Sequence, residues 1–168
     1  MTVALCWLIL AVIGALPFVL SREIPFFIDA LFETVSGFTT TGATILGDVE
    51  ALSHASMLWR CLTHWVGGMG VLVFAVALLP KSNSEDIYIL KSEMPGPTFD
   101  KVLSRVRTVA RVFYVIYAVL TLILICILIG AGMSPYDAIL HAFATAGTGG
   151  LSTRALSIGY YNSAYIDI

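Results

Sequence analysis

Residues 25–44 have the sequence PFFIDALFETVSGFTTTGAT, in which an apolar segment is followed at once by threonine and glycine. Pro25 suits the first turn of a helix, because proline lacks the N–H group that this turn leaves unpaired. The helix that we expect over residues 25–38 is too short to cross about 30 Å of hydrocarbon, which needs about 20 residues. The stretch therefore predicts a short helix followed by irregular backbone.

The same order of parts recurs near the end of the chain. Residues 134–145 have the sequence SPYDAILHAFAT, and AGTGGLST follows at 146–153. A constant offset of 108 positions aligns the two stretches without a gap: Asp29 with Asp137, Ala30 with Ala138, Leu31 with Ile139, Thr40 with Thr148, Gly42 with Gly150, and Thr44 with Ser152. An internal repeat of this kind indicates pseudo-symmetric units around a shared axis.

The composition is typical of a membrane protein. The chain has 168 residues, of which 58% are hydrophobic and 12% are charged, with a mean hydropathy of +0.91. A soluble domain usually has about 25% charged residues, which cover its surface. Three runs without Asp, Glu, Lys or Arg are predicted to span the membrane as helices: residues 2–20, 61–80 and 112–133. The alternatives are buried core helices and, for the first run, a signal peptide, although no basic segment precedes it.

The positive charges indicate how the spans are oriented. Segment 81–111 has six Lys and Arg residues, whereas segment 21–60 has two. Because Lys and Arg concentrate on the cytoplasmic side, we predict that 81–111 is cytoplasmic and that 21–60 and 134–160 face outward. The predicted organisation is a first helix–pore-loop–helix unit over 1–80, a cytoplasmic link over 81–106, and the start of a second unit over 107–168.

The threonine and glycine strips are suited to bind a dehydrated cation. Irregular backbone at membrane depth is tolerated only where it is buried in protein or lines a water-filled path. The C-terminal end of the short helix carries partial negative charge, and the strip after it can direct backbone carbonyls at an ion. Neither strip contains a carboxylate of the kind that binds divalent ions. The alternative is a polar turn at the membrane surface, and the recurrence of the strip favours the ion site.

Other polar and small residues near the strips have simpler interpretations. Glu33 is a functional candidate because carboxylates near membrane depth are rare. We expect Glu33 either to bind the backbone of the strip or to lie at the water boundary. His141, which the offset places opposite Glu33, is predicted to have a hydrogen-bonded packing role. Gly67, Gly68 and Gly70 are predicted to let neighbouring helices approach closely.

Several function classes find no support in the sequence. Neither Ser36 nor Ser152 lies in a nucleophile motif such as G-x-S-x-G, so we predict no catalytic residue. The three cysteines lie in apolar runs without metal-ligand or disulfide spacing, and no cofactor is predicted. A net charge of −2 and the lack of a basic patch argue against a nucleic-acid partner.

Three stretches resemble the TrkH-type subunit of the Trk/Ktr/HKT potassium transporters: FETVSGFTTTGATIL (32–46), WRCLTHWVGGMGVLVFAVALLP (59–80) and HAFATAGTGGLST (141–153). Members of this family carry four helix–pore-loop–helix units around a single pore. The chain is similar to the first unit and the beginning of the second. The resemblance implies an N-terminal-half fragment of an all-α membrane protein, with about three transmembrane helices and two re-entrant pore helices.

The resemblance also implies the cargo and the site residues. Potassium is the implied transported ion. Its coordinating backbone carbonyls would belong to Thr40, Thr41, Thr148 and Gly149, with filter support from Gly42, Ala43, Gly150 and Leu151. Plant sodium-selective relatives carry serine at the position of Gly42, so glycine there is implied to favour potassium.

The implied setting is a multi-pass protein of the cell (plasma) membrane, in contact with the lipid bilayer. The family assembles as a homodimer that docks on a cytosolic, TrkA-like ring of nucleotide-binding regulatory subunits. Two alternatives of other classes remain. One is a non-conducting membrane scaffold or truncated remnant of a transporter. The other is an intramembrane enzyme, which would need a nucleophile and a base on facing helices that we do not identify.

Overall fold

The computed structural model describes residues 2–78, 98–154, 156–163 and 165–166. Within these ranges every regular element is a helix and no residue is in a strand. The elements are α1 (Thr2–Leu20), α2 (Phe27–Phe38), α3 (His54–Leu78), α5 (Thr98–Gly130), α6 (Pro135–Ala146) and a 3-10 helix, η1 (Ser157–Tyr161). The helical part of the predicted fold class is therefore confirmed.

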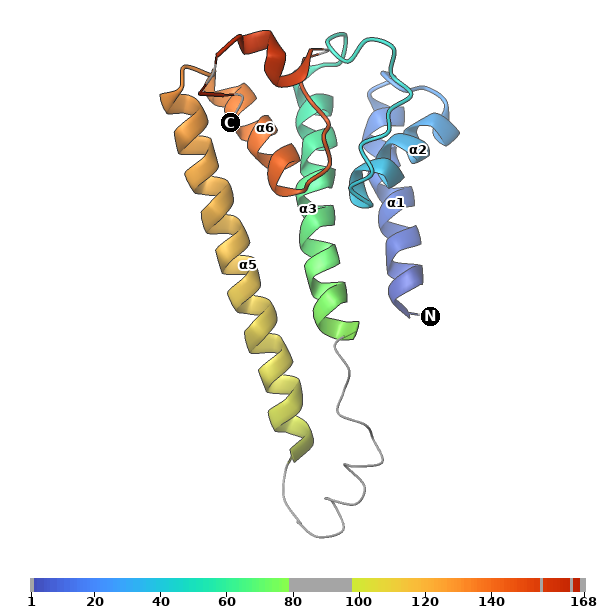
Figure 1. Cartoon of the computed structure of the whole chain (residues 1–168). Helices are drawn as coiled ribbons and strands as arrows, with labels where there is room; N and C mark the ends of the chain where they lie inside the picture. The colour runs from blue at the N-terminus through green and yellow to red at the C-terminus, as the bar shows by residue number, and fades with distance from the viewer. Residues whose placement is uncertain (1, 79–97, 155, 164, 167–168) are drawn as a thin grey trace.

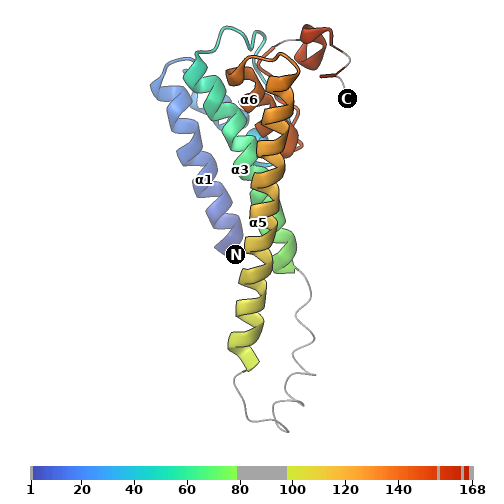
Figure 2. The same ribbon diagram turned by 90° about the vertical axis from the view of Figure 1, so that its left-hand side faces the viewer.

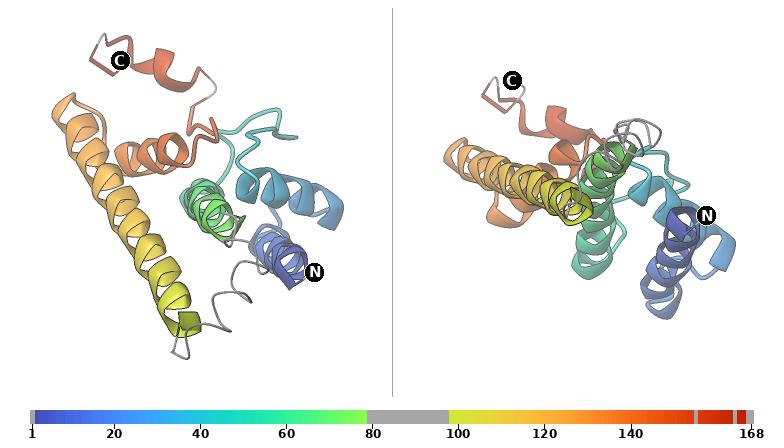
Figure 3. Two further views of the ribbon diagram at one scale, coloured as in Figure 1. Left: turned by 60° about the horizontal axis from the view of Figure 1, so that its bottom comes forward. Right: turned by 90° about the horizontal axis from the view of Figure 1, so that it is seen from below.

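Three long helices, α1, α3 and α5, run side by side, and the short helices α2 and α6 lie toward one end of them (Figure 1). Seen from the side, the C-terminal segment lies at the end that carries α6, and the N-terminus lies away from that end (Figure 2). Helix α3 lies between the pair α1–α2 and the pair α5–α6 (Figure 3). It packs against both short helices, so α3 joins the two units.

The observed bounds agree with some predicted ranges and extend others. Helix α1 ends at Leu20, as expected, but α3 begins at His54, ahead of the run predicted from residue 61. Arg60, which we counted among the outward-facing charges, is therefore a helical residue, and it is buried. Helix α5 begins at Thr98 and so occupies part of the range predicted as a link. Residues 81–97 of that link lie outside the described residues, and its cytoplasmic location stays a prediction.

One helix in the described part of the chain is long and apolar enough to cross a membrane, over Val109–Gly130. Leu5–Leu20 forms a shorter apolar helix. Many large apolar side chains on α5 are exposed, including Val115, Leu120 and Leu122. Because exposed apolar area of this extent is unfavourable in water, this face needs lipid or another apolar surface. The spans predicted over 2–20 and 61–80 stay predictions.

Helices α1 and α5 each pack on the short helix that follows them through a buried cluster. In the first unit the cluster contains Ala15, Phe18, Ile24 and Ala30, and in the second it contains Leu128, Met133, Ala138, Ala142 and Ile166. A third cluster, with Met57, Cys61 and Leu140, joins α3 to α6. The two short helices are thus fixed from both sides, which sets where the backbone after each of them begins.

The glycines of α3 allow this close packing. A Cβ atom added at Gly67 would lie 2.3 Å from the carbonyl oxygen of Phe38. A Cβ at Gly68 would lie 2.7 Å from the hydroxyl of Tyr117, and one at Gly70 would lie 2.8 Å from the ring of Trp7. The packing role predicted for the three glycines is confirmed.

Candidate functional site

The two short helices end in the same way. In the first unit three backbone N–H groups bond back into the helix: Thr39 to Val35 at 2.9 Å, Thr40 to Gly37 at 3.0 Å, and Thr41 to Ser36 at 3.0 Å. The second unit has the same three bonds: Gly147 to Phe143 at 3.0 Å, Thr148 to Thr145 at 2.9 Å, and Gly149 to Ala144 at 3.0 Å. Every donor and acceptor is related by the offset of 108, so the sequence alignment of the repeat holds for the backbone.

The backbone angles of the following residues also match. Thr40 and Thr148 have φ values of 55° and 54°, and Gly42 and Gly150 have values of 74° and 76°. Positive φ is unusual for a β-branched residue and costs of order 1–3 kcal/mol, so it persists only where the surroundings impose it. We call residues 40–43 the first strip and residues 148–151 the second strip. Both strips hold the same strained conformation immediately after a helix C-terminus.

The two strips come into close contact where Gly42 meets Gly149. A Cβ atom added at Gly42 would lie 1.9 Å from the carbonyl oxygen of Gly149, so no side chain fits there. The family resemblance implies an ion-coordinating role for Gly149 and a supporting role for Gly42, and the structure brings these two residues together. At Gly150, by contrast, an added Cβ would meet no atom within 4 Å among the described residues.

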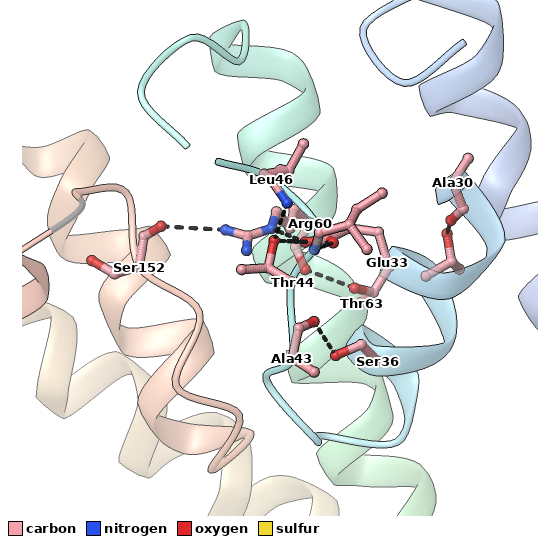
Figure 4. A network of polar contacts seen from close by, with 11 residues as sticks. Ala30, Glu33, Ser36, Ala43, Thr44, Leu46, Arg60, Thr63 and Ser152 are labelled. Carbon is pink, nitrogen blue, oxygen red and sulfur yellow. Dashed lines mark hydrogen bonds and ion pairs between the residues drawn. The ribbon is translucent and has the colours of Figure 1, made fainter. Parts of the chain in front are cut away.

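A buried ion pair lies behind the first strip. The Nε of Arg60 donates to Oε1 of Glu33 at 2.6 Å, and the two side chains are 2% and 0% exposed. Figure 4 shows the pair between α2 and α3, together with its neighbours. The hydroxyl of Thr44 donates to both oxygens of the Glu33 carboxylate, at 3.0 and 3.1 Å, and the N–H of Ile45 donates to Oε2 at 3.3 Å. Glu33 is therefore buried rather than at a water boundary, and the backbone group that it binds is the N–H of Ile45, two residues beyond the first strip, rather than the strip itself.

Arg60 also contacts the second unit. Its Nη1 donates to the backbone carbonyl of Ser152 at 3.4 Å, one residue beyond the second strip (Figure 4). Sequence reasoning missed this residue because it was counted as a loop charge. The sequence did contain a signal. Arg60 immediately precedes the uncharged run 61–80, and a charged residue on such a helix needs a partner. Glu33 was the carboxylate already singled out nearby.

A second polar contact joins the first strip to α2, the helix that precedes it. The hydroxyl of Ser36 donates to the carbonyl of Ala43 at 2.6 Å. This bond occupies one acceptor position of the Ala43 carbonyl. The offset places Ala144 opposite Ser36, and alanine has no hydroxyl with which to form the equivalent bond.

The family of this chain follows from its sequence and structural matches. Residues 1–168 match the family model TrkH, described as a cation transport protein. The chain belongs to the TrkH family. It is 44% identical over 167 residues to the Trk system potassium uptake protein TrkH of Escherichia coli K12, covering 98% of this chain and 35% of that protein. It is 40% identical over 168 residues to TrkG of the same strain, covering 99% of this chain and 35% of TrkG.

A solved structure also resembles this TrkH-family chain. The crystal structure of the potassium transporter TrkH from Vibrio parahaemolyticus matches with a TM-score of 0.79 at 36% sequence identity. The match covers 97% of this chain and 32% of that one. The chain therefore spans about a third of the length of the relatives that it matches. Membership in a family of transport proteins supports the prediction that the chain is not an enzyme.

Two histidines of this TrkH-family chain lie close to the second strip. His64 is fully buried, and neither ring nitrogen has a hydrogen-bond partner in the described part of the chain. A Cβ at Gly149 would lie 1.8 Å from its Nδ1, so the ring packs directly against the strip. The Nε2 of His141 also lacks a partner among the described residues, while its ring packs edge-on against Tyr161. The packing predicted for His141 is present, but a hydrogen bond at Nε2 is not.

Proposed function

We propose that this chain forms part of a pathway that carries potassium across a membrane, with the two strips lending backbone carbonyls to the ion. The observation that carries the proposal is the match of the strips in φ angles and hydrogen bonds, together with the contact of Gly42 and Gly149. Two strained segments follow two helix C-termini and meet at Gly42 and the Gly149 carbonyl, which supports a grouping of strip carbonyls in this region. Carbonyls so grouped can replace the water shell of a monovalent cation.

The proposed coordinating carbonyls are those of Thr40, Thr41, Thr148 and Gly149, and the supporting residues are Gly42, Ala43, Gly150 and Leu151. Support for this division comes from the surroundings of each group. Ala43 already accepts a hydrogen bond from Ser36, and Gly42 makes room for the carbonyl of Gly149. The helix C-termini add partial negative charge below both strips, which favours a cation.

The charge near the strips suits a monovalent ion. Glu33 lies next to the end of the first strip, but its carboxylate is paired with Arg60 and bonded to Thr44. An unpaired carboxylate would present the hard, charged oxygen ligands that divalent cations prefer. Because the pair is neutral as a whole, the ion would interact mainly with carbonyl dipoles, which bind more weakly and allow release.

The features of the whole protein belong to the same proposal. The relatives named above are potassium uptake proteins about three times as long as this chain. We propose that further units complete a four-unit pore in the cell membrane, and that the protein acts as a homodimer docked on a cytosolic ring of nucleotide-binding subunits. The helix over Val109–Gly130 supports a spanning arrangement.

Rubidium uptake tests the proposal directly. The full-length transporter that contains this chain is expressed in cells that lack their own potassium uptake, and the amount of protein in the membrane is measured in parallel. We expect growth at low potassium and rubidium uptake that potassium inhibits better than sodium does. Protein present in the membrane without any rubidium uptake would support the non-conducting scaffold instead.

A further inference from the structure

Arg60 occupies an unusual position for an arginine. It is 1% exposed, it lies on an apolar helix, and its Nε is bonded to Glu33 of α2. A buried charge that loses its partner is strongly unfavourable, so the Glu33 carboxylate holds the guanidinium in a fixed place. Burying two charges is costly unless their remaining hydrogen-bonding groups are also satisfied, so the other N–H groups of the Arg60 guanidinium need acceptors.

The guanidinium has two ends that serve different units. Its Nε bonds to α2 of the first unit, while its Nη1 points to the carbonyl of Ser152 in the second unit (Figure 4). Because a guanidinium is planar and rigid, fixing the orientation at Nε also fixes the direction of Nη1. Arg60 therefore fixes the position of Ser152, which follows the second strip, relative to α2, which precedes the first strip.

Within the described ranges, the second strip lacks the hydrogen bonds from side chains of its own short helix that the first unit has. The positions of Glu33 and Ser36 are taken by His141 and Ala144. Alanine has no hydroxyl, and the Nε2 of His141 has no partner in the described ranges. Among the described residues no side chain of α6 bonds to residues 150–153; the Ser152 hydroxyl accepts locally from the N–H of Arg154, and the Ser152 carbonyl accepts from Arg60 of the other unit.

We propose that Arg60 is a positioning residue for selectivity: it sets the second strip relative to the first through the Ser152 carbonyl. This inference rests on the proposed potassium pathway. Selectivity between potassium and sodium depends on the spacing and number of carbonyls around the ion. Because Arg60 binds Glu33 in one unit and Ser152 in the other, it keeps the spacing between the two strips constant. Arg60 itself does not contact the ion.

The decisive variant is Arg60→Lys in the full-length transporter. Lysine keeps the positive charge next to Glu33, but its single ammonium group lacks the planar fork that reaches two partners at once. We expect the amount of protein in the membrane and the maximal rubidium uptake rate to stay within about twofold of the parent. We expect inhibition of this uptake by sodium to become about tenfold stronger, which corresponds to the loss of one charge-assisted contact.

The matched control is Arg154→Lys. Arg154 also joins the two units, through a contact of 3.2 Å with Glu50, but these side chains are 33% and 42% exposed. Exposed pairs of this kind contribute little, so this variant should keep the sodium sensitivity of the parent. Ser152→Ala should also be silent in this assay, because Arg60 binds the backbone carbonyl of Ser152 and not its hydroxyl.

The inference is overturned if Arg60→Lys takes up rubidium with the sodium sensitivity of the parent. Should this variant fail to reach the membrane, Glu33→Gln combined with Arg60→Gln provides a neutral pair that keeps an acceptor for Thr44. The shorter glutamine does not extend to Ser152, so we expect strong inhibition by sodium, and parental selectivity would again overturn the inference. A parent that takes up no rubidium at all would instead defeat the proposed function.

Discussion

The first and second units have the same backbone at the end of their short helices, but different side chains hold the residues that follow. In the first unit Glu33 binds Thr44, and Ser36 binds Ala43. In the second unit the corresponding positions are His141 and Ala144, for which no such bonds are found in the described residues. The strip conformation therefore follows from the helix end, which the units share, whereas its support differs from unit to unit.

The two units also differ in what their strips contact. Gly42 lies against a carbonyl of the second strip, whereas a Cβ atom added at Gly150 would meet no non-neighbouring atom within 4 Å in the described part of the chain. Equal φ angles at these two glycines do not imply equal surroundings. Substitutions at matched positions in the two units can separate the requirement for a positive φ from the requirement for space.

The largest effect is expected from Glu33→Ala. This change leaves the Arg60 guanidinium buried without its carboxylate, which typically costs about 3–5 kcal/mol. The matched change in the second unit, His141→Leu, removes a ring nitrogen that has no observed partner and should cost less than about 1.5 kcal/mol. Thermal unfolding of the purified full-length protein in detergent measures both. Equal losses would contradict the difference in support between the units.

Gly42→Ser is expected to weaken selection for potassium over sodium. A side chain at this position displaces the Gly149 carbonyl, and the positive φ adds strain. Loss of one aligned carbonyl corresponds to about 1–3 kcal/mol, or roughly a 5- to 150-fold change in relative affinity. Rubidium uptake against rising sodium measures the change. If the variant has the sodium sensitivity of the parent, the assignment of residues 40–43 to the filter is wrong.

Ser36→Ala makes the first unit resemble the second, which has Ala144 at this position. It removes the hydrogen bond of 2.6 Å to the Ala43 carbonyl, and we expect stability to fall by about 1 kcal/mol. The shift in sodium inhibition should be smaller than for Gly42→Ser, because Ala43 is a supporting residue. The same unfolding and uptake assays apply. A shift in selectivity as large as that of Gly42→Ser would instead place the Ala43 carbonyl on the ion.

Thr44→Ser should have the smallest effect. Serine keeps the hydroxyl that donates to both oxygens of Glu33, and the residue lies just beyond the first strip. We expect sodium inhibition of rubidium uptake within about twofold of the parent, equivalent to less than about 0.5 kcal/mol. A larger change would show that the methyl group of Thr44 contributes to the strip through packing.

Local patterns were enough to predict the short helices and the repeat. Helix α6 begins at Pro135 and α2 ends at Phe38, close to the ranges read from proline, apolar residues and the threonine and glycine that follow. Both strips also depend mainly on hydrogen bonds within four or five residues of the helix end. Short-range chemistry of this kind is visible in the sequence.

The contacts between distant segments were not predictable in the same way. Arginine is rarely buried, so a lone Arg60 at the start of an apolar run was assigned to a loop. Its partners lie 27 and 92 positions away, at separations for which no periodic pattern exists. The contact of Gly42 with Gly149 likewise depends on how α3 sets the two units against each other.

The contact at Gly42 has a consequence for assembly. It joins unlike surfaces, since the first unit presents the flat face of a glycine and the second presents a carbonyl oxygen. A heterologous, head-to-tail interface of this type leaves one unmatched surface at each end, and repeating it yields a closed ring or an open helix. If the further units proposed above repeat this contact, a carbonyl of the third unit would lie against Gly150. In a closed ring, the carbonyl of Thr41, which matches Gly149, would lie against the final unit. Every unit would then need glycine at the position that matches Gly42.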